Sequence, residues 1–272
     1  MSKIPISALL GLIITASYFL VAIFAPWIAP YGMAEIVGGV WEPSSDKFLL
    51  GTDTIGRDLL TRMIYGAQTT IFIATAGTAL SFTVGSILGF SAAVFGGAFD
   101  QFLSRFMDLI MSIPTLIFAL VVLSVMPVTI PILILVMGFL DCTRVYRVAR
   151  AVAVDISVMD YVEAAILRGE KKGWIIFREL LPNALSPLVA EMGLRFIFMV
   201  LFISTLSFLG LGIQPPMADW GGIVKENKDG IVYGIPAALA PAVAIATLAI
   251  SVNLVADWIL NRTTSLKGGR GQ

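Results

Sequence analysis

The sequence predicts an all-α, polytopic membrane protein with six transmembrane helices. Hydrophobic residues make up 58% of the 272-residue chain and charged residues only 13%, about half the charged fraction of a typical soluble domain. Six apolar stretches are long enough to cross about 30 Å of hydrocarbon, which takes roughly 20 helical residues. Lys and Arg gather in alternate connecting segments, as they do in membrane proteins with a fixed orientation.

The predicted spans follow from the apolar runs in chain order. They cover residues 6–28, 69–95, 107–126, 130–149, 185–211 and 235–260. The first run is too long for the apolar region of a signal peptide and has no convincing small-residue cleavage site, which favours a retained anchor. We therefore predict an N-terminal anchor helix and outer loop in residues 1–68 and a five-helix core in residues 69–272.

The orientation follows from where the basic residues fall. With the N-terminus inside, the cytosolic segments hold twelve basic residues and the outer segments hold five. The cytosolic ones are Lys3, Arg105, Arg144, Arg147, Arg150, Arg168, Lys171, Lys172, Arg178, Arg262, Lys267 and Arg270, and the outer ones are Lys47, Arg57, Arg62, Lys225 and Lys228. Both ends are therefore predicted to be cytosolic, with outer loops near residues 30–67 and 212–234 and a large cytosolic loop near residues 150–184.

Small residues recur every four positions in the second predicted span, at Gly77, Ser81, Gly85 and Gly89. This spacing places them along one face of a helix, where they let a second helix approach closely. The stripe predicts tight helix packing within the bundle.

Composition also excludes several kinds of site. The eighteen basic and eighteen acidic residues cancel, so net charge does not indicate a nucleic-acid partner. The chain has no histidine, which removes His-based catalytic triads, His metal sites and imidazole proton relays. No P-loop motif is present, so any nucleotide chemistry must belong to another chain. Cys142 is the only cysteine, which rules out an intrachain disulfide.

The cytosolic loop changes from apolar runs to amphipathic periodicity. Apolar residues recur at i, i+3, i+4 and i+7, at Val158, Tyr161, Val162 and Ala165. Ser157 followed by Asp160 suggests a capping box at the start of a surface helix, and Gly169 suits the left-handed residue that ends one. A second amphipathic stretch, residues 174–181, is expected to end at Pro182.

The residue pattern of this loop resembles the EAA loop of binding-protein-dependent ABC permeases. The matching residues are Glu163, Ala164, Ala165, Gly169, Leu181, Pro182 and Asn183. In that family the Gly follows the Glu by six residues and the Pro follows the Gly by thirteen, and both spacings hold here. The resemblance implies coupling helices that lie in a groove of an ATPase subunit. The alternative is an interfacial helix on lipid headgroups.

Other segments resemble the dipeptide and oligopeptide branch of these permeases. The matches include Leu50-Gly51-Thr52-Asp53, Gly56-Arg57-Asp58, Tyr65-Gly66-Ala67, Asp100, Arg105, Asp108, Ser112-Ile113-Pro114, Ser207 through Gly212, Gln214-Pro215-Pro216, Trp220-Gly221, Asn253 and Asp257. The resemblance implies a type I ABC importer permease fold in a bacterial or archaeal cytoplasmic membrane. It also implies a second homologous permease subunit, two ATPase subunits or domains that hold ATP and Mg²⁺, and a soluble binding protein at the outer face. This chain would bind no cofactor itself.

On this resemblance, the outer loops around Asp53, Arg57, Gln214 and Trp220 lie where a binding protein would dock. The alternative is that these loops are tightly turned and held by Gly, Pro and internal Asp–Arg pairs. The sequence leaves both possibilities open.

Charges inside the predicted spans need partners or a function. Glu191 and Arg195 stand four residues apart in the fifth span and can pair on one helix face. If the hydrocarbon crossing starts near residue 185, Arg195 lies about 15 Å deep and faces a wet path. If it starts at Phe196, both residues are interfacial. We hypothesise that the pair lines the translocation path, and that Asp141 pairs with a neighbouring arginine, Arg144 or Arg147.

The chain departs from the family pattern at three positions. Relatives often carry an acidic residue where Ile203 stands, a small residue where Arg195 stands, and His or Ile where Glu179 stands. The first two departures alter the charge along the path and leave the cargo open among peptides, nickel chelates, glutathione and oligosaccharides. An ion-coupled secondary transporter would also explain buried charges but would not need an EAA loop, and no inverted repeat is visible.

Overall fold

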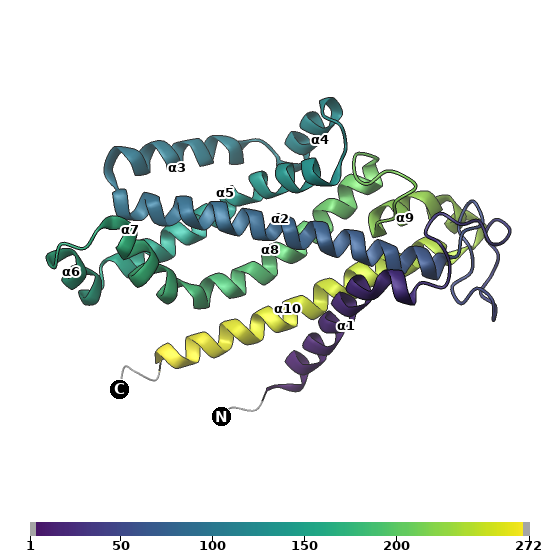
Figure 1. Ribbon diagram of the computed structural model, residues 1–272, viewed down its shortest axis with the longest axis horizontal. Coiled ribbons are helices and arrows are strands. Elements are labelled where there is room, and N and C mark those ends of the chain that lie inside the picture. The colour runs from purple at the N-terminus through teal and green to yellow at the C-terminus, as the bar shows by residue number, and fades with distance from the viewer. Residues whose placement is uncertain (1–3, 269–272) are drawn as a thin grey trace. The chain divides into compact units, whose positions relative to one another are not determined.

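The computed structural model describes residues 4–268, and this part of the chain is helical almost throughout (Figure 1). Within those residues, β pairing is limited to two isolated bridges, Ile36–Arg57 and Thr52–Asp58. The all-α prediction is therefore confirmed. Lys3 and Arg270, which entered the orientation argument, lie outside the described residues, as do the side chains of Arg262 and Lys267.

Five long helices account for most of the predicted spans. They are α1 (Ile6–Ile28), α2 (Leu59–Phe95), α5 (Ile130–Ser157), α8 (Leu181–Leu209) and α10 (Leu239–Gly268). The bounds of α1 agree with the prediction. Helix α2 begins at Leu59 rather than residue 69, so the boundary expected between residues 68 and 69 falls inside a continuous helix.

The span predicted at residues 107–126 is wrong as a single helix. The chain forms α3 (Gly97–Ser112) and α4 (Thr115–Val125), which are bent by 82°. Between them, Ile113 has an extended backbone with φ −88° and ψ 128° and is followed by Pro114. A proline ring disfavours the helical conformation of the preceding residue, so Pro114 explains the break.

The expected count of six spans is not confirmed. Four helices among the described residues are long and apolar enough to cross a membrane, and the bent pair α3 and α4 would make a fifth. Helix α5 is not among them. It carries Asp141 and three arginines at positions 144, 147 and 150, which lower its hydropathy.

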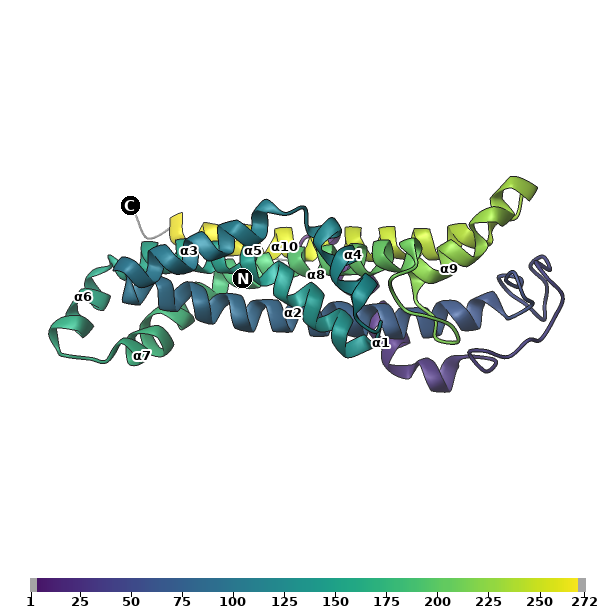
Figure 2. The same ribbon diagram turned by 90° about the horizontal axis from the view of Figure 1, so that it is seen from above.

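Short helices fill both loop regions that the sequence left between spans. In the predicted cytosolic loop they are α6 (Asp160–Leu167), α7 (Lys172–Trp174) and the π-helix η1 (Ile175–Leu180). In the second predicted outer loop and just after it they are α9 (Trp220–Asn227) and the 3₁₀ helices η2 (Lys228–Tyr233) and η3 (Pro236–Ala238). Helices α6 and α7 lie near one another at one end of their unit (Figure 2).

The chain divides into two compact units, each built from several segments. Unit 1 comprises Met1–Ala76, Leu120–Ile134 and Phe196–Val255, and unit 2 comprises Gly77–Ala119, Leu135–Arg195 and Ala256–Gln272. Helices α2, α4, α5, α8 and α10 each contribute residues to both units. Unit 1 contains the predicted outer loops, and unit 2 contains the predicted cytosolic loop.

In unit 2, α2 packs closely against α5 along the small-residue stripe. A Cβ atom added to Gly85 would lie 2.7 Å from the carbonyl oxygen of Cys142, and one added to Gly89 would lie 2.8 Å from that of Tyr146. Contacts that short do not leave room for a side chain. The prediction of tight helix packing at these two glycines is therefore confirmed.

Candidate functional site

Helix α6 carries the EAA residues, but it does not start with the predicted capping box. Its N-cap residue is Met159, and no side chain caps the helix. Ser157 instead belongs to the end of α5, where its hydroxyl donates to the carbonyl oxygen of Val154 at 2.8 Å. The capping-box prediction is wrong because α5 extends farther than the apolar run and takes up Ser157.

Only half of the predicted apolar stripe of α6 faces the protein. Val162 and Ala165 are buried, and Val162 packs in a cluster with residues of α5, η1 and α8. The other two stripe residues, Val158 and Tyr161, are exposed. A helix of two turns is not stable alone, so Val162 and Ala165 hold α6 in place.

The outer face of α6 combines charge, small side chains and exposed apolar surface. Glu163 and Ala164 are exposed. Ile166 is 56% exposed and Leu167 is 81% exposed. Large apolar side chains left open on a short surface helix are typical of a surface that contacts a protein partner or a membrane.

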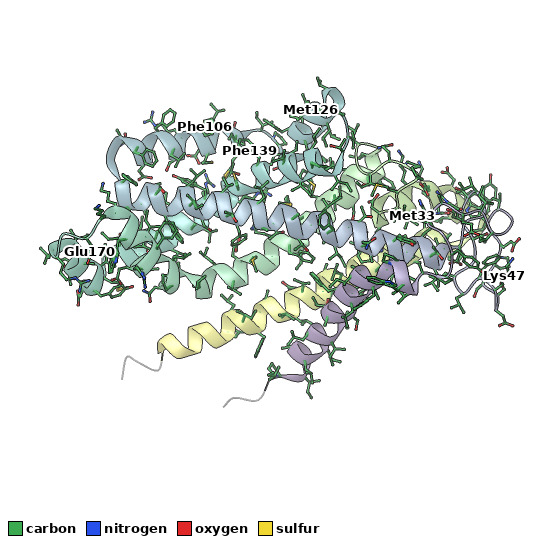
Figure 3. All side chains as sticks on the ribbon, viewed as in Figure 1. Met33, Lys47, Phe106, Met126, Phe139 and Glu170 are labelled. Atoms are coloured by element: carbon green, nitrogen blue, oxygen red, sulfur yellow. The ribbon has the colours of Figure 1, made fainter. Side chains whose placement is uncertain are left out.

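Gly169 ends α6 as the sequence predicts. Its φ of +79° is left-handed, and its N–H donates to the carbonyl oxygen of Ile166 at 2.9 Å. The N–H of Glu170, labelled in Figure 3, donates to the carbonyl oxygen of Ala165 at 3.2 Å. This pair of bonds is the Schellman arrangement, which favours glycine at the left-handed position.

Pro182 does not end a helix, contrary to the prediction. It lies in the first turn of α8, which continues directly from η1. The π-helical turn moves the N–H of Leu181 to the carbonyl oxygen of Ile176, and the Asn183 side chain donates to the carbonyl oxygen of Glu179 at 2.7 Å. The wider turn and the amide accommodate a proline, which has no N–H and cannot continue a regular helical ladder.

The outer-loop residues Asp53 and Arg57 are buried in a network of ion pairs in unit 1. Arg57 Nε lies 2.5 Å from Asp53 Oδ2, and Arg57 Nη2 lies 2.6 Å from Glu226 Oε2. Arg62 shares the same Glu226 oxygen at 2.8 Å and donates to the carbonyl oxygen of Pro216 at 3.0 Å. Glu226 therefore ties the first outer loop and the start of α2 to α9.

Trp220 is also buried, whereas Gln214 is exposed. Trp220 Nε1 donates to the carbonyl oxygen of Met63 at 3.1 Å, and its backbone N–H donates to Thr70 Oγ1 at 3.1 Å. The side chain of Gln214 donates to the carbonyl oxygens of Gly210 and Gly212. Of the four residues expected near a docking surface, only Gln214 lies at the surface of this chain.

Asp219 caps the N-terminus of α9 from a buried position. Its side chain accepts hydrogen bonds from the N–H groups of Gly221 and Gly222. Burial raises the pKa of this carboxyl to about 6 because it disfavours the charged form, and the hydrogen bonds oppose that effect.

The two path candidates form the expected pair and gain a third partner. Arg195 Nε donates to Glu191 Oε1 at 2.7 Å, along one face of α8. Arg195 Nη1 also donates to Asp141 Oδ1 on α5 at 3.4 Å, and Arg144 lies 3.8 Å from the same oxygen. Arg147 pairs instead with Asp108 of α3 at 2.8 Å. The candidate span Pro187–Leu209 includes both Glu191 and Arg195.

Comparison with known proteins identifies the family. Residues 81–265, more than half of the chain, match the family model described as "binding-protein-dependent transport system inner membrane component". The chain belongs to this family. The resemblance stated from the EAA loop is therefore confirmed, and the secondary-transporter alternative is not supported.

Several curated relatives of this inner membrane component align over nearly its whole length. A putative peptide transport system permease protein of Brucella suis biovar 1 is 36% identical over 251 residues, covering 92% of this chain and 84% of the relative. The dipeptide permease DppC of Haemophilus influenzae is 31% identical, covering 93% and 88%. The oligopeptide permease OppC of Bacillus subtilis is 29% identical, covering 93% and 83%.

Sequence reasoning missed the partners that join distant segments of this inner membrane component. No sequence pattern marks Glu226 as the partner of Arg57 and Arg62, because it stands 169 and 164 residues away from them. The predicted pairing of Asp141 with Arg144 is present at 3.8 Å, but the shorter ion pair with Arg195 of another helix, at 3.4 Å, was missed. The available signal was the unmatched charge of Asp141 in an apolar run, which demands a partner somewhere in the bundle.

Proposed function

We propose that this inner membrane component is the transmembrane permease subunit of an ATP-driven importer for peptides or peptide-sized solutes. The names of its relatives support peptide cargo. The chain forms half of the translocation path, and a second homologous permease subunit forms the other half. Two ATPase subunits or domains bind ATP and Mg²⁺, so this chain binds no cofactor and catalyses no reaction.

The surface of α6 is the observation that carries the coupling role. Glu163 and Ala164 are exposed between Tyr161 and the exposed pair Ile166 and Leu167. The buried side of α6 packs on residues of η1, which runs without a break into α8. A force applied to α6 is therefore passed to a long membrane helix. ATP binding closes the ATPase pair and shifts the permease between two states, which requires a different affinity for each state.

The second part of the EAA resemblance has a mechanical role in this proposal. Leu181 and Pro182 stand at the junction of η1 and α8. A π-helical turn is a common site of local adjustment within helices. Motion of the coupling helix would then turn α8 at this junction, and Gly169 would keep α6 short enough to fit the ATPase groove.

The outer loops are proposed to receive a soluble binding protein. Gln214 is exposed and is available for direct contact. Asp53, Arg57 and Trp220 are buried, so they serve docking by fixing the shape of the loops. We place both termini on the cytosolic side of a bacterial or archaeal cytoplasmic membrane, from the distribution of Lys and Arg.

Co-purification tests the proposal most directly. The chain, expressed with its partner subunits, is expected to purify with an ATPase and a second permease chain. Glu163→Arg places the wrong charge on the contact face, and Gly169→Arg places a bulky side chain at a φ of +79°. Both variants should lose the ATPase while keeping the second permease chain.

Asp155→Arg is the matched control, because Asp155 is exposed on α5 outside α6 and the charge change is the same. This variant should retain the ATPase and its transport activity. Normal assembly and transport in both α6 variants would refute the coupling role.

A further inference from the structure

A groove of about 440 Å³ runs within unit 2 along α2, η1 and α8. Its lining is almost wholly apolar and includes Phe82, Phe90, Ile176, Leu188 and Met192. Pockets that hold small molecules typically measure 300–1,000 Å³. The groove is therefore large enough for the apolar side chains of a small solute.

Two charged residues of α8 flank the last residue of this helix that lines the groove. Met192 lines the groove, Glu191 precedes it directly, and Arg195 follows it within one helical turn. Glu191 and Asp141 both accept hydrogen bonds from Arg195, at 2.7 and 3.4 Å. The two carboxylates hold the guanidinium group in one orientation.

This pair keeps unused hydrogen-bonding capacity. A guanidinium group has five N–H donors, and among the side chains that the structure describes only two of those on Arg195 have a partner. In the same part of the chain, one oxygen of Glu191 has no partner. The side chains of Arg195 and Glu191 are 20% and 18% exposed, so a ligand can reach both.

The surroundings of the pair indicate the kind of ligand. Both residues lie in the candidate span Pro187–Leu209, where exposed charges are strongly disfavoured against lipid and instead mark substrate pathways. Arg144, 3.8 Å from Asp141, makes the cluster two guanidinium groups and two carboxylates. A neutral cluster of this kind favours a ligand with one positive and one negative group over an ion of one sign.

We propose that the groove and the Glu191–Arg195 pair form a cargo site for short zwitterionic peptides. Arg195 binds the terminal carboxylate, Glu191 binds the terminal ammonium group, and the groove takes apolar side chains. Arg195 Nε and Glu191 Oε1 lie 2.7 Å apart, and two extended residues span about 7 Å, so a dipeptide reaches the unused groups at the two outer ends of the pair rather than the paired atoms. This site rests on the proposed import of peptides and adds the residues that choose among them.

Uptake of three labelled probes into vesicles holding the full importer tests the site. The probes are leucyl-leucine, its C-terminal amide and its N-acetyl form. Each variant importer is compared with the unmodified importer, and both are supplied with the same binding protein. A change in the ratio of uptake between two probes is therefore caused by the permease. Arg195→Gln should reduce the preference for the free acid over the amide about tenfold, the loss expected for a charged hydrogen-bonded contact. Glu191→Gln should reduce the preference for the free amine over the acetylated form.

Arg147→Gln is the control, because it removes an arginine of a surface ion pair that does not involve the cluster. It should leave both ratios unchanged. If Arg195→Gln does not assemble, Arg195→Lys is used, which keeps the positive charge and loses the planar guanidinium group with its paired N–H donors. Unchanged ratios in assembled Arg195 and Glu191 variants would overturn the site alone. An unmodified importer that takes up none of the probes would overturn both the site and the proposed function.

Discussion

Two arginine–carboxylate clusters in this chain share the same chemistry and differ in exposure. In unit 1, Arg57 and Arg62 surround Glu226, and their side chains are 6% and 1% exposed. In unit 2, Arg195 meets Glu191 with side chains 20% and 18% exposed. Glu226 itself is 22% exposed, so what differs between the clusters is the burial of the arginines. We call the first cluster closed because both of its arginines are buried, and the second open because Arg195 is partly exposed and keeps unused donors. The same residue types therefore serve a structural role where they are buried and are available to a ligand where they are partly exposed.

The largest expected effect comes from breaking the closed cluster. Glu226→Gln removes the charge that Arg57 and Arg62 share, and leaves Arg62, which is 1% exposed, with the carbonyl oxygen of Pro216 at 3.0 Å and the Asp53 carboxylate at 3.9 Å. Breaking a buried ion pair by removing one partner costs about 3–5 kcal/mol. Thermal unfolding of the purified protein in detergent should shift strongly downwards. A shift no larger than that of Glu191→Gln would remove the distinction between the two clusters.

The closed region should also be sensitive to pH through Asp219. Burial raises the pKa of Asp219 from 3.8 to about 6, so the folded protein binds a proton more tightly than the unfolded chain. Stability should therefore fall as the pH rises from about 4 to about 6, by up to about 3 kcal/mol, with the full loss present above pH 6.

Unfolding measured across this range should show that slope. Asp219→Asn keeps an oxygen that can accept from the N–H groups of Gly221 and Gly222, so it should retain the helix cap and flatten the slope. An unchanged slope in that variant would assign the pH effect to another group.

Breaking the open cluster should affect stability less. Glu191→Gln leaves Arg195 its bond to Asp141 and keeps a side-chain oxygen as acceptor. We expect a loss of about 1.5–3 kcal/mol, the value of a hydrogen bond to a charged group, measured by the same thermal unfolding. A loss equal to that of Glu226→Gln would mean that this cluster is also mainly structural.

The smallest effect is expected at a fully accessible pair. Arg147 and Asp108 meet at 2.8 Å, with side chains 58% and 57% exposed. Exposed pairs contribute about 0–1 kcal/mol, so Asp108→Asn should leave the unfolding temperature nearly unchanged. A large shift in this variant would show that exposure in the isolated chain is a poor guide to the strength of these pairs.

The main features of the fold could be predicted because they depend on local composition. The continuous apolar run of α1 sets its bounds, and the small-residue stripe marks where α5 approaches α2. The bend between α3 and α4 was missed because apolar length was counted across Pro114. Attention to the residue before proline would have predicted it.

The candidate site was predictable to a smaller extent. The spacing of Glu163 and Gly169 identified the cytosolic loop, and the left-handed glycine was correctly assigned. The start of α6 was misplaced, since a capping motif does not reveal that the previous helix extends through Ser157. The continuation of the helix through Pro182 was also missed. The π-helical turn that accommodates this proline leaves no recognisable periodicity in the sequence.

The sequence by itself determined that this chain is an α-helical membrane protein of a transport family, since apolar length, charge placement and motif spacing are local properties. Only the tertiary structure decided which charges meet. Arg57 and Arg62 converge on Glu226, and Arg195 turns to Asp141, because packing brings helices together that are distant in sequence. The two clusters then differ in the burial of their arginines, which are buried in the first cluster and partly exposed in the second. A charge cut off from water must be satisfied within the protein, whereas a partly exposed charge can bind a ligand.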